Sequence, residues 1–95
     1  MIEREFTITS EFGLHARPAG QLAALASKFE AEIEISNHSE WVNAQSVLSL
    51  LSLAAGPGST VRVRASGPDA EQAMAAIEEL VECWGENEGD AGAPA

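Results

Sequence analysis

Cysteine, basic residues and long apolar runs are all scarce in this sequence. Its single cysteine, Cys83, cannot form an internal disulfide and is typical of a reducing compartment. Five Lys and Arg against fifteen Asp and Glu give a net charge of −10, which argues against nucleic acids and anionic membrane surfaces, because both attract basic faces. No segment approaches the roughly 20 apolar residues of a membrane helix, and the charged N-terminal segment is unlike a signal peptide. We therefore expect a cytoplasmic protein without nucleic-acid partners or membrane insertion.

The length limits the architecture to one small domain. At 95 residues the chain is too short for a TIM barrel or for a two-domain nucleotide enzyme. An apolar content of 45% is ordinary for a globular protein that buries its own core.

Alternation with a period of two predicts four strands. Residues 2–8 place Arg4 among the apolar side chains of one side, with acids and a threonine on the other. The same alternation returns in residues 31–35, in a short stretch that begins at Trp41, and in residues 61–65. The polar residues between the second and third of these strands are typical of a turn.

Apolar residues at helical spacing predict three helices. The first is expected from Pro18 to Phe29, the second over residues 47–53, and the third after Gly67-Pro68-Asp69 as far as Trp84. Residues 85–95 are acidic and rich in Gly and Ala, so we expect a disordered tail behind a domain formed by residues 1–84.

The order β-α-β-β-α-β-α predicts an α+β fold, with a four-stranded antiparallel sheet and three helices on one of its faces. The other face should be wet and should carry cross-strand ion pairs, each worth up to about 1 kcal/mol. The side chains expected on that face are Glu3, Glu5, Glu32, Glu34, Arg62 and Arg64.

The segment between the first strand and the first helix carries the best candidate for chemistry, His15. Gly13 allows a sharp turn before it. The free backbone amides of Ala16 and Arg17 precede Pro18 and are expected to point outward beside the imidazole. The guanidinium of Arg17 adds a planar set of donors that suits phosphate oxygens.

These features are what a phosphorylatable histidine needs. The positive end of a helix disfavours imidazolium, so the ring keeps a nucleophilic lone pair near neutral pH. After phosphorylation, the same amides and Arg17 would face and stabilise a dianion. No nucleotide-binding loop, metal-ligand cluster or acid–base pair accompanies the histidine, so we expect neither metal nor cofactor. The residues indicate a stoichiometric carrier of phosphoryl groups between proteins, not a turnover enzyme.

Two motifs resemble those of a known family. The run Gly-Leu-His-Ala-Arg-Pro-Ala at residues 13–19 resembles the active-centre signature of HPr, the phosphocarrier family of the bacterial phosphoenolpyruvate-dependent sugar phosphotransferase system. The run Asn-Ala-Gln-Ser-Val-Leu at residues 43–48 resembles the second signature of that family. The similarity extends over about residues 1–84.

The resemblance implies a specific function. His15 would accept a phosphoryl group on Nδ1 from phosphorylated enzyme I and donate it to a histidine of an enzyme IIA domain, with Arg17 as the electrostatic partner of His15. It also implies an open-faced β-sandwich, and we expect a monomer.

Ser46 has two compatible interpretations. From the residues alone it is the N-cap of the helix at 47–53. The resemblance adds phosphorylation by an HPr kinase/phosphorylase, and a phosphate at a helix N-terminus need not disturb the fold. Gln45 stands where regulated members often carry a basic residue.

An apolar patch beside His15 is the expected docking surface for enzyme I and the IIA domains, as the resemblance implies. By contrast, Leu50 and Leu53 are expected to face the sheet. Many members surround the patch with lysines, whereas this chain has Ala24, Ser27 and Ser49 there, which weakens attraction to acidic partners. The patch is expected to comprise Ala19, Gly20, Ala23, Val47, Leu48 and Leu51.

Two further functions remain open. The missing lysines are also consistent with a phosphocarrier of the nitrogen-related branch, which regulates and does not import sugar. A regulatory binding module that docks through residues 47–51, switched by Ser46 phosphate, is the third. Of the remaining candidates, His38 is expected in a hairpin turn, Cys83 in helix packing, and Trp41 and Trp84 as core or edge anchors.

Overall fold

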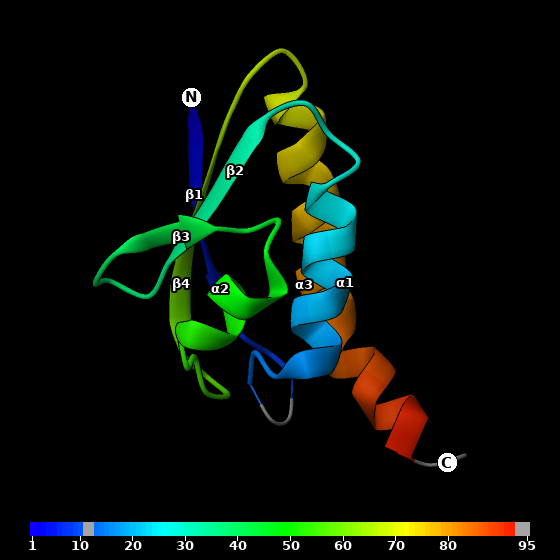
Figure 1. Cartoon of the computed structure of the whole chain (residues 1–95). Helices are drawn as coiled ribbons and strands as arrows, with labels where there is room; N and C mark the ends of the chain where they lie inside the picture. The colour runs from blue at the N-terminus through cyan, green and yellow to red at the C-terminus, as the bar shows by residue number, and fades with distance from the viewer. Residues whose placement is uncertain (11–12, 93–95) are drawn as a thin grey trace.

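The sheet has the predicted antiparallel form. The structure is a computed structural model that describes residues 1–10 and 13–92, with side chains as far as Trp84. Four strands pair in the order β1-β4-β2-β3, and every neighbouring pair is antiparallel (Figure 1). The strands are β1 (Ile2–Thr7), β2 (Glu32–Ser36), β3 (Trp41–Asn43) and β4 (Thr60–Ser66).

Three helices cover one face of this sheet, as expected (Figure 1). The two longer helices, α1 and α3, lie side by side across it, and the short α2 packs against α1 and β3. The helices are α1 (Ala16–Ala26), α2 (Val47–Ser52) and α3 (Ala70–Gly92). The α+β prediction and the order of elements are confirmed.

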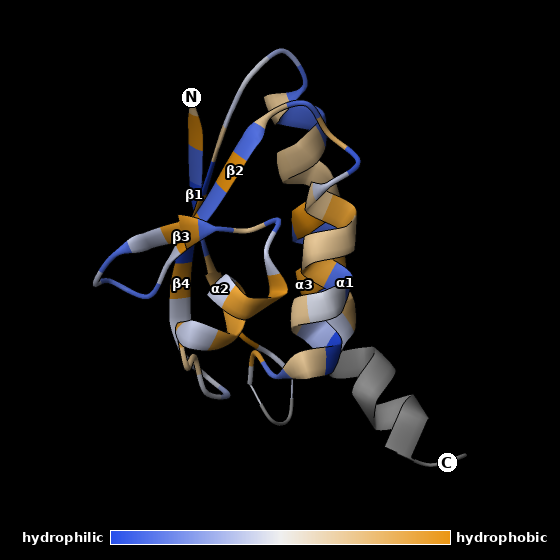
Figure 2. Ribbon diagram, viewed as in Figure 1, coloured by the Kyte–Doolittle hydropathy of each residue, from blue (hydrophilic) through white to orange (hydrophobic). Residues whose placement is uncertain are grey.

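The core lies between the sheet and the two long helices, where the apolar residues of both layers meet (Figure 2). Alternate residues of β2 and β4 point inward, so the period-two pattern reports burial directly. Its largest fully buried side chains include Leu22, Ile33, Ile35, Val61, Val63, Met74 and Ile77.

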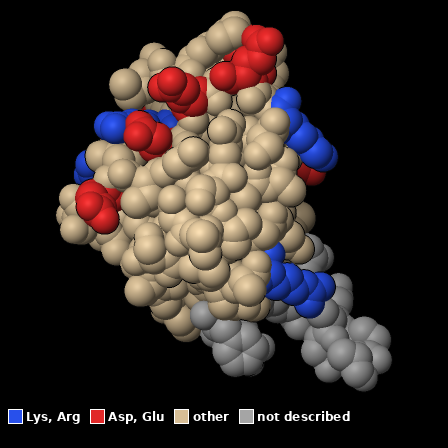
Figure 3. All heavy atoms as spheres, in the orientation of Figure 1, with Lys and Arg blue, Asp and Glu red and all other residues tan. Residues whose placement is uncertain are grey.

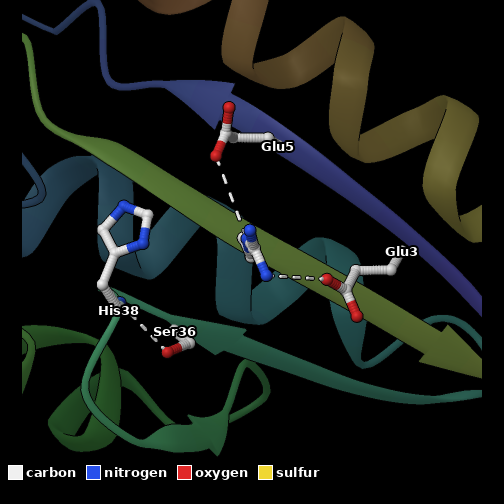
Figure 4. Close-up of polar contacts among 5 residues, drawn as sticks. Glu3, Glu5, Ser36 and His38 are labelled. Atoms are coloured by element: carbon white, nitrogen blue, oxygen red, sulfur yellow. Dashed lines mark hydrogen bonds and ion pairs between the residues drawn. The ribbon is translucent and has the colours of Figure 1, made fainter.

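The wet face of the sheet carries the expected ion pairs. Arg62 of β4 reaches Glu3 Oε2 at 3.5 Å and Glu5 Oε2 at 3.9 Å, as Figure 4 shows for the two acids. Arg64 Nε lies 2.8 Å from Glu34 Oε1, and its guanidinium lies 4.0 Å from the centre of the Trp41 ring. Arg62 thus pairs β4 with acids of β1, and Arg64 pairs β4 with an acid of β2, which favours the observed placement of β4 between these two strands.

Arg4 shares the helix-facing side of β1 with apolar residues and still stays exposed. Because β1 is an edge strand, the side chain extends past the core and bonds Glu78 of α3. The predicted side of the strand was therefore correct, and the ion pair explains how a charge is tolerated there.

Helix α3 continues beyond the position where the sequence predicts its end. The backbone is helical through Gly92, so the helix enters the segment that the sequence assigns to the tail, and the tail as a unit separate from the domain stays a prediction. Extending an existing helix avoids the unfavourable nucleation step. Residues 93–95 lie outside the described part, and a domain boundary at residue 84 stays a prediction.

Asp69 fastens the start of α3 to the turn between α1 and β2. Its two carboxylate oxygens accept hydrogen bonds from the backbone amides of Glu30 and Ala31 at 2.9 and 2.8 Å, and its carbonyl accepts from Ala73 N at 2.9 Å. Nearby, Gly67 has φ +144°, and a Cβ there would lie 2.8 Å from Ala31 Cα. The sequence therefore places a carboxylate and a glycine where two distant turns meet.

Replacing Asp69 by Ala should lower the free energy of unfolding by about 2–3 kcal/mol, because two backbone donors lose a charged acceptor. Urea unfolding followed by circular dichroism measures this change. The control is Glu71→Ala, which removes an exposed acid two residues along the chain. Equal stability of the two variants would contradict a fastening role for Asp69.

Candidate functional site

His15 occupies the N-cap of α1. Its backbone is extended, with φ −91° and ψ −170°, and its carbonyl accepts the first helical hydrogen bond from Ala19 N at 2.9 Å. The helix thus begins two residues before Pro18, which lies in the first turn, where the lack of an N–H costs nothing. The imidazole is half-buried, so the ring is anchored at one end of the helix and still open to solvent.

The backbone before His15 is fixed by a contact with the segment that follows α2. Leu14 N donates to Ala55 O at 2.8 Å. Gly13 has φ +76°, and a Cβ at this position would lie 2.4 Å from the same Ala55 oxygen. Only glycine therefore permits this close approach. The side chain of Leu14 is also buried. Its burial and its hydrogen bond to Ala55 together fix the backbone directly before His15.

Two backbone donors directly follow His15 at the start of α1. The amides of Ala16 and Arg17 belong to the first turn of α1, so the helix itself offers them no carbonyl acceptor. Both residues are exposed, and this end of the helix carries its partial positive charge. An anionic group on the imidazole would therefore face backbone hydrogen-bond donors at the positive end of the helix.

Arg17 adds a full positive charge at the same end. Its side chain belongs to an exposed residue of the first turn. Figure 3 shows one basic group at the lower end of this face and a middle without charge, while acidic and further basic side chains lie in the upper part of the view. The guanidinium of Arg17 and the first backbone amides of α1 thus belong to the same helical turn.

This arrangement suits transient acceptance of a phosphoryl group on a histidine. Among the side chains that the structure describes, no three His, Cys, Asp or Glu residues gather where they could hold a metal ion. In the same described part of the chain, no helix combines the length and apolar character needed to cross a membrane.

Ser46 is the N-cap of α2, as the sequence predicts. Its hydroxyl oxygen accepts from Ser49 N at 3.3 Å, and its carbonyl accepts from Leu50 N at 3.0 Å. The preceding Gln45 donates from Nε2 to Ala26 O, at the C-terminal end of α1, at 3.2 Å. Ser46 therefore lies near the end of α1, and His15 lies at its start. Helix α1 itself has eleven residues and is therefore roughly 16 Å long.

The expected apolar patch is smaller than predicted. Leu48 is 80% exposed, and Val47 and Leu51 are each 37% exposed. Ala19, by contrast, is 0% exposed, because it lies on the side of α1 that faces the core. Ala19 is therefore not part of an exposed docking surface.

The same correction applies to Ala23, which is also buried, whereas Gly20 is half-buried with open space above its Cα. We define the apolar patch as Gly20, Val47, Leu48 and Leu51. Leu50 and Leu53 are buried against the core, as predicted.

The remaining candidate residues lie in the hairpin between β2 and β3 and on α3. His38 lies in the hairpin between β2 and β3 with φ +80°, and its amide donates to Ser36 Oγ (Figure 4). Trp84 is buried, and its Nε1 donates to Gln21 Oε1 at 2.8 Å, which joins α3 to α1. Cys83 is half-buried on α3.

Comparison with known proteins over nearly the whole chain shows the family to which this protein belongs. The family model described as PTS HPr component phosphorylation site matches residues 2–83. The chain belongs to the HPr family. It is thus a member of the phosphocarrier proteins of the phosphotransferase system, and the matched range includes His15, Arg17 and Ser46.

Individual relatives agree with this assignment. The phosphocarrier protein HPr of Xylella fastidiosa strain Temecula1 is 42% identical over 82 residues, which cover 86% of this chain and 92% of that protein. The phosphocarrier protein NPr of Shewanella violacea is 47% identical over 81 residues, covering 85% of this chain and 89% of the relative. A crystal structure of HPr from Thermoanaerobacter tengcongensis superimposes with a TM-score of 0.86 at 36% identity, covering 90% and 97% of the two chains.

The sequence did not reveal the contact that fixes the site. The two signatures predict His15 and Ser46, but the bond from Leu14 to Ala55 joins segments about forty residues apart. One signal was available, since Gly13 stands where a turn precedes a helix. Glycine alone, however, does not say which carbonyl it approaches.

Two glycine variants should have opposite effects on stability. Gly13→Ala should lower the free energy of unfolding by about 2–4 kcal/mol, because a Cβ clashes with Ala55 O in a backbone conformation that disfavours side chains. Gly20→Ala places its methyl in open space within a helix and should raise stability by up to about 1 kcal/mol. Urea unfolding measures both, and a tolerated Gly13→Ala would overturn the close-contact account.

Proposed function

We propose that this protein accepts a phosphoryl group on Nδ1 of His15 from phosphorylated enzyme I and passes it to a histidine of an enzyme IIA domain. In each transfer a new phosphorus–nitrogen bond forms at the acceptor as the bond between phosphorus and the donor breaks, with donor and acceptor in line. The protein acts as a stoichiometric carrier and needs no cofactor of its own.

One observation carries this proposal. Within a chain of the HPr family, His15 caps α1 beside two exposed backbone amides and Arg17. Stabilisation by a helix end and one arginine amounts to about 0.3–2 kcal/mol for each contribution. Such modest stabilisation suits a carrier, because a tightly held group could not be passed on.

Docking is assigned to the apolar patch. Its residues come from α1 and from α2, two helices that pack against each other, and those of α2 are exposed. Because positive charge near the patch is sparse, we expect association with enzyme I and IIA domains to depend mainly on apolar contact and to respond weakly to salt.

A carrier of the nitrogen-related branch is the second candidate. It is favoured by the scarcity of lysines around the patch and by the 47% identity to a protein named NPr. Phosphorylation rates with the enzyme I of each branch, measured on the same preparation, distinguish the two, since the physiological donor should be the faster one.

Regulation through Ser46 extends the proposal. Its hydroxyl caps α2 directly before the patch residues Val47 and Leu48, so a phosphate added by an HPr kinase/phosphorylase would put negative charge at the edge of the docking surface. The same placement supports the alternative of a binding module that is switched by Ser46 phosphate.

Incubation with enzyme I and phosphoenolpyruvate should add one acid-labile, base-stable phosphoryl group. His15→Ala should abolish the modification, because it removes the acceptor nitrogen, while His38→Ala should leave it intact. Intact-mass spectrometry at neutral pH measures the product. Phosphorylation of the His15→Ala protein would be incompatible with the proposed carrier function.

Ser46→Asp should weaken binding of enzyme I by several-fold, since it adds charge beside the apolar patch. Ser52→Asp adds the same charge at the far end of α2 and should have a smaller effect. Titration calorimetry with enzyme I compares the two variants. Equal affinities of both variants and the unmodified protein would remove the support for a serine switch.

A further inference from the structure

Ser10 is one of two polar residues buried in the described part of the chain, the other being Ser36. Neither of the two family signatures includes Ser10. The ion pairs and packing of the sheet also do not explain why a hydroxyl is buried at this position. Its surroundings, however, lead directly to the backbone of His15.

Ser10 holds Gly13 through two bonds. Its carbonyl accepts from Gly13 N at 3.1 Å, and its side-chain hydroxyl donates to Gly13 O. The same Gly13 oxygen also accepts from His15 N at 3.0 Å. One carbonyl therefore receives both the Ser10 hydroxyl and the amide of the phosphorylation residue.

The two sides of this turn have separate supports. Ala55 O holds Leu14 N from the side of α2, whereas the Ser10 hydroxyl holds Gly13 O from the side of β1. Without the hydroxyl, the peptide between Gly13 and Leu14 loses one of the bonds that fix its carbonyl. The amide of His15, which depends on that carbonyl, is then less firmly oriented.

We propose that Ser10 is a positioning residue for phosphoryl transfer. Its buried hydroxyl fixes the Gly13 carbonyl, which in turn orients His15 at the start of α1. The inference rests on the proposed phosphorylation of His15 and adds a residue outside the signatures. Orientation matters here because a displacement of about 1 Å from a productive geometry can reduce a rate by on the order of 100-fold.

The test compares Ser10→Ala with Ser36→Ala. Each variant deletes one buried hydroxyl that makes a single side-chain hydrogen bond, and Ser36 Oγ accepts from His38 N in a hairpin away from α1 (Figure 4). Similar losses of stability are therefore expected from both. Only Ser10→Ala should slow phosphorylation by enzyme I, by about three- to tenfold, the value of one hydrogen bond.

Two further measurements exclude a purely structural effect. Hydrolysis of phosphorylated His15 in the absence of any partner should change in Ser10→Ala and stay unchanged in Ser36→Ala. Hydrogen exchange of the His15 amide in the unphosphorylated protein should accelerate in Ser10→Ala alone. Should Ser10→Ala not fold, Ser10→Cys keeps the size with a weaker donor and should show the same changes to a smaller extent.

The outcomes separate this inference from the proposed function. A Ser10→Ala protein with unchanged transfer, hydrolysis and His15 amide exchange would overturn the positioning role. If the unmodified protein takes no phosphate from enzyme I, the proposed function fails. Faster exchange of the His15 amide in Ser10→Ala would still support the contact by which Ser10 orients the backbone of His15.

Discussion

The close approach of Gly13 to the carbonyl of Ala55 determines where α1 begins, and the rest of the site depends on it. It requires a residue without Cβ and with positive φ, and it brings the buried Leu14 amide into hydrogen-bond distance of that carbonyl. With this point fixed, His15 becomes the N-cap, and the amides of the next two residues are left for a ligand. A steric constraint at one glycine thus produces a site whose backbone hydrogen-bond donors for an anion are already in place.

The surface around this site differs in charge from the sheet on the opposite face. On the sheet, arginines pair with acids of neighbouring strands, so most of their charge is used within the molecule. On the helical face, exposed apolar residues of α2 follow Ser46, and α2 packs against α1, whose first turn carries Arg17. The two candidate phosphorylation residues, His15 and Ser46, thus cap two helices that pack against each other.

Much of the fold was predictable from local patterns, because strand alternation and helical spacing report burial directly. The paired arginines and acids of the sheet, and the N-cap at Ser46, also followed from residue type. Burial of Ala19 did not, since an alanine fits either face of a helix, and a resemblance to a docking region does not give its orientation. The end of α3 was missed because the Gly, Asn and Asp residues of this segment have weak helix propensity, which an existing helix overrides. The Gly13–Ala55 and Ser10–Gly13 contacts depend on chain folding that no local pattern encodes.

The central claim is that the exposed amides at the start of α1 donate hydrogen bonds to the phosphoryl group on His15. Proton–nitrogen NMR spectra of the protein before and after phosphorylation by enzyme I test it most directly. The account predicts large downfield shifts of the Ala16 and Arg17 amide protons and little change at Val47 and Leu48 on α2. Phosphorylated His15 with unmoved Ala16 and Arg17 amides would contradict it.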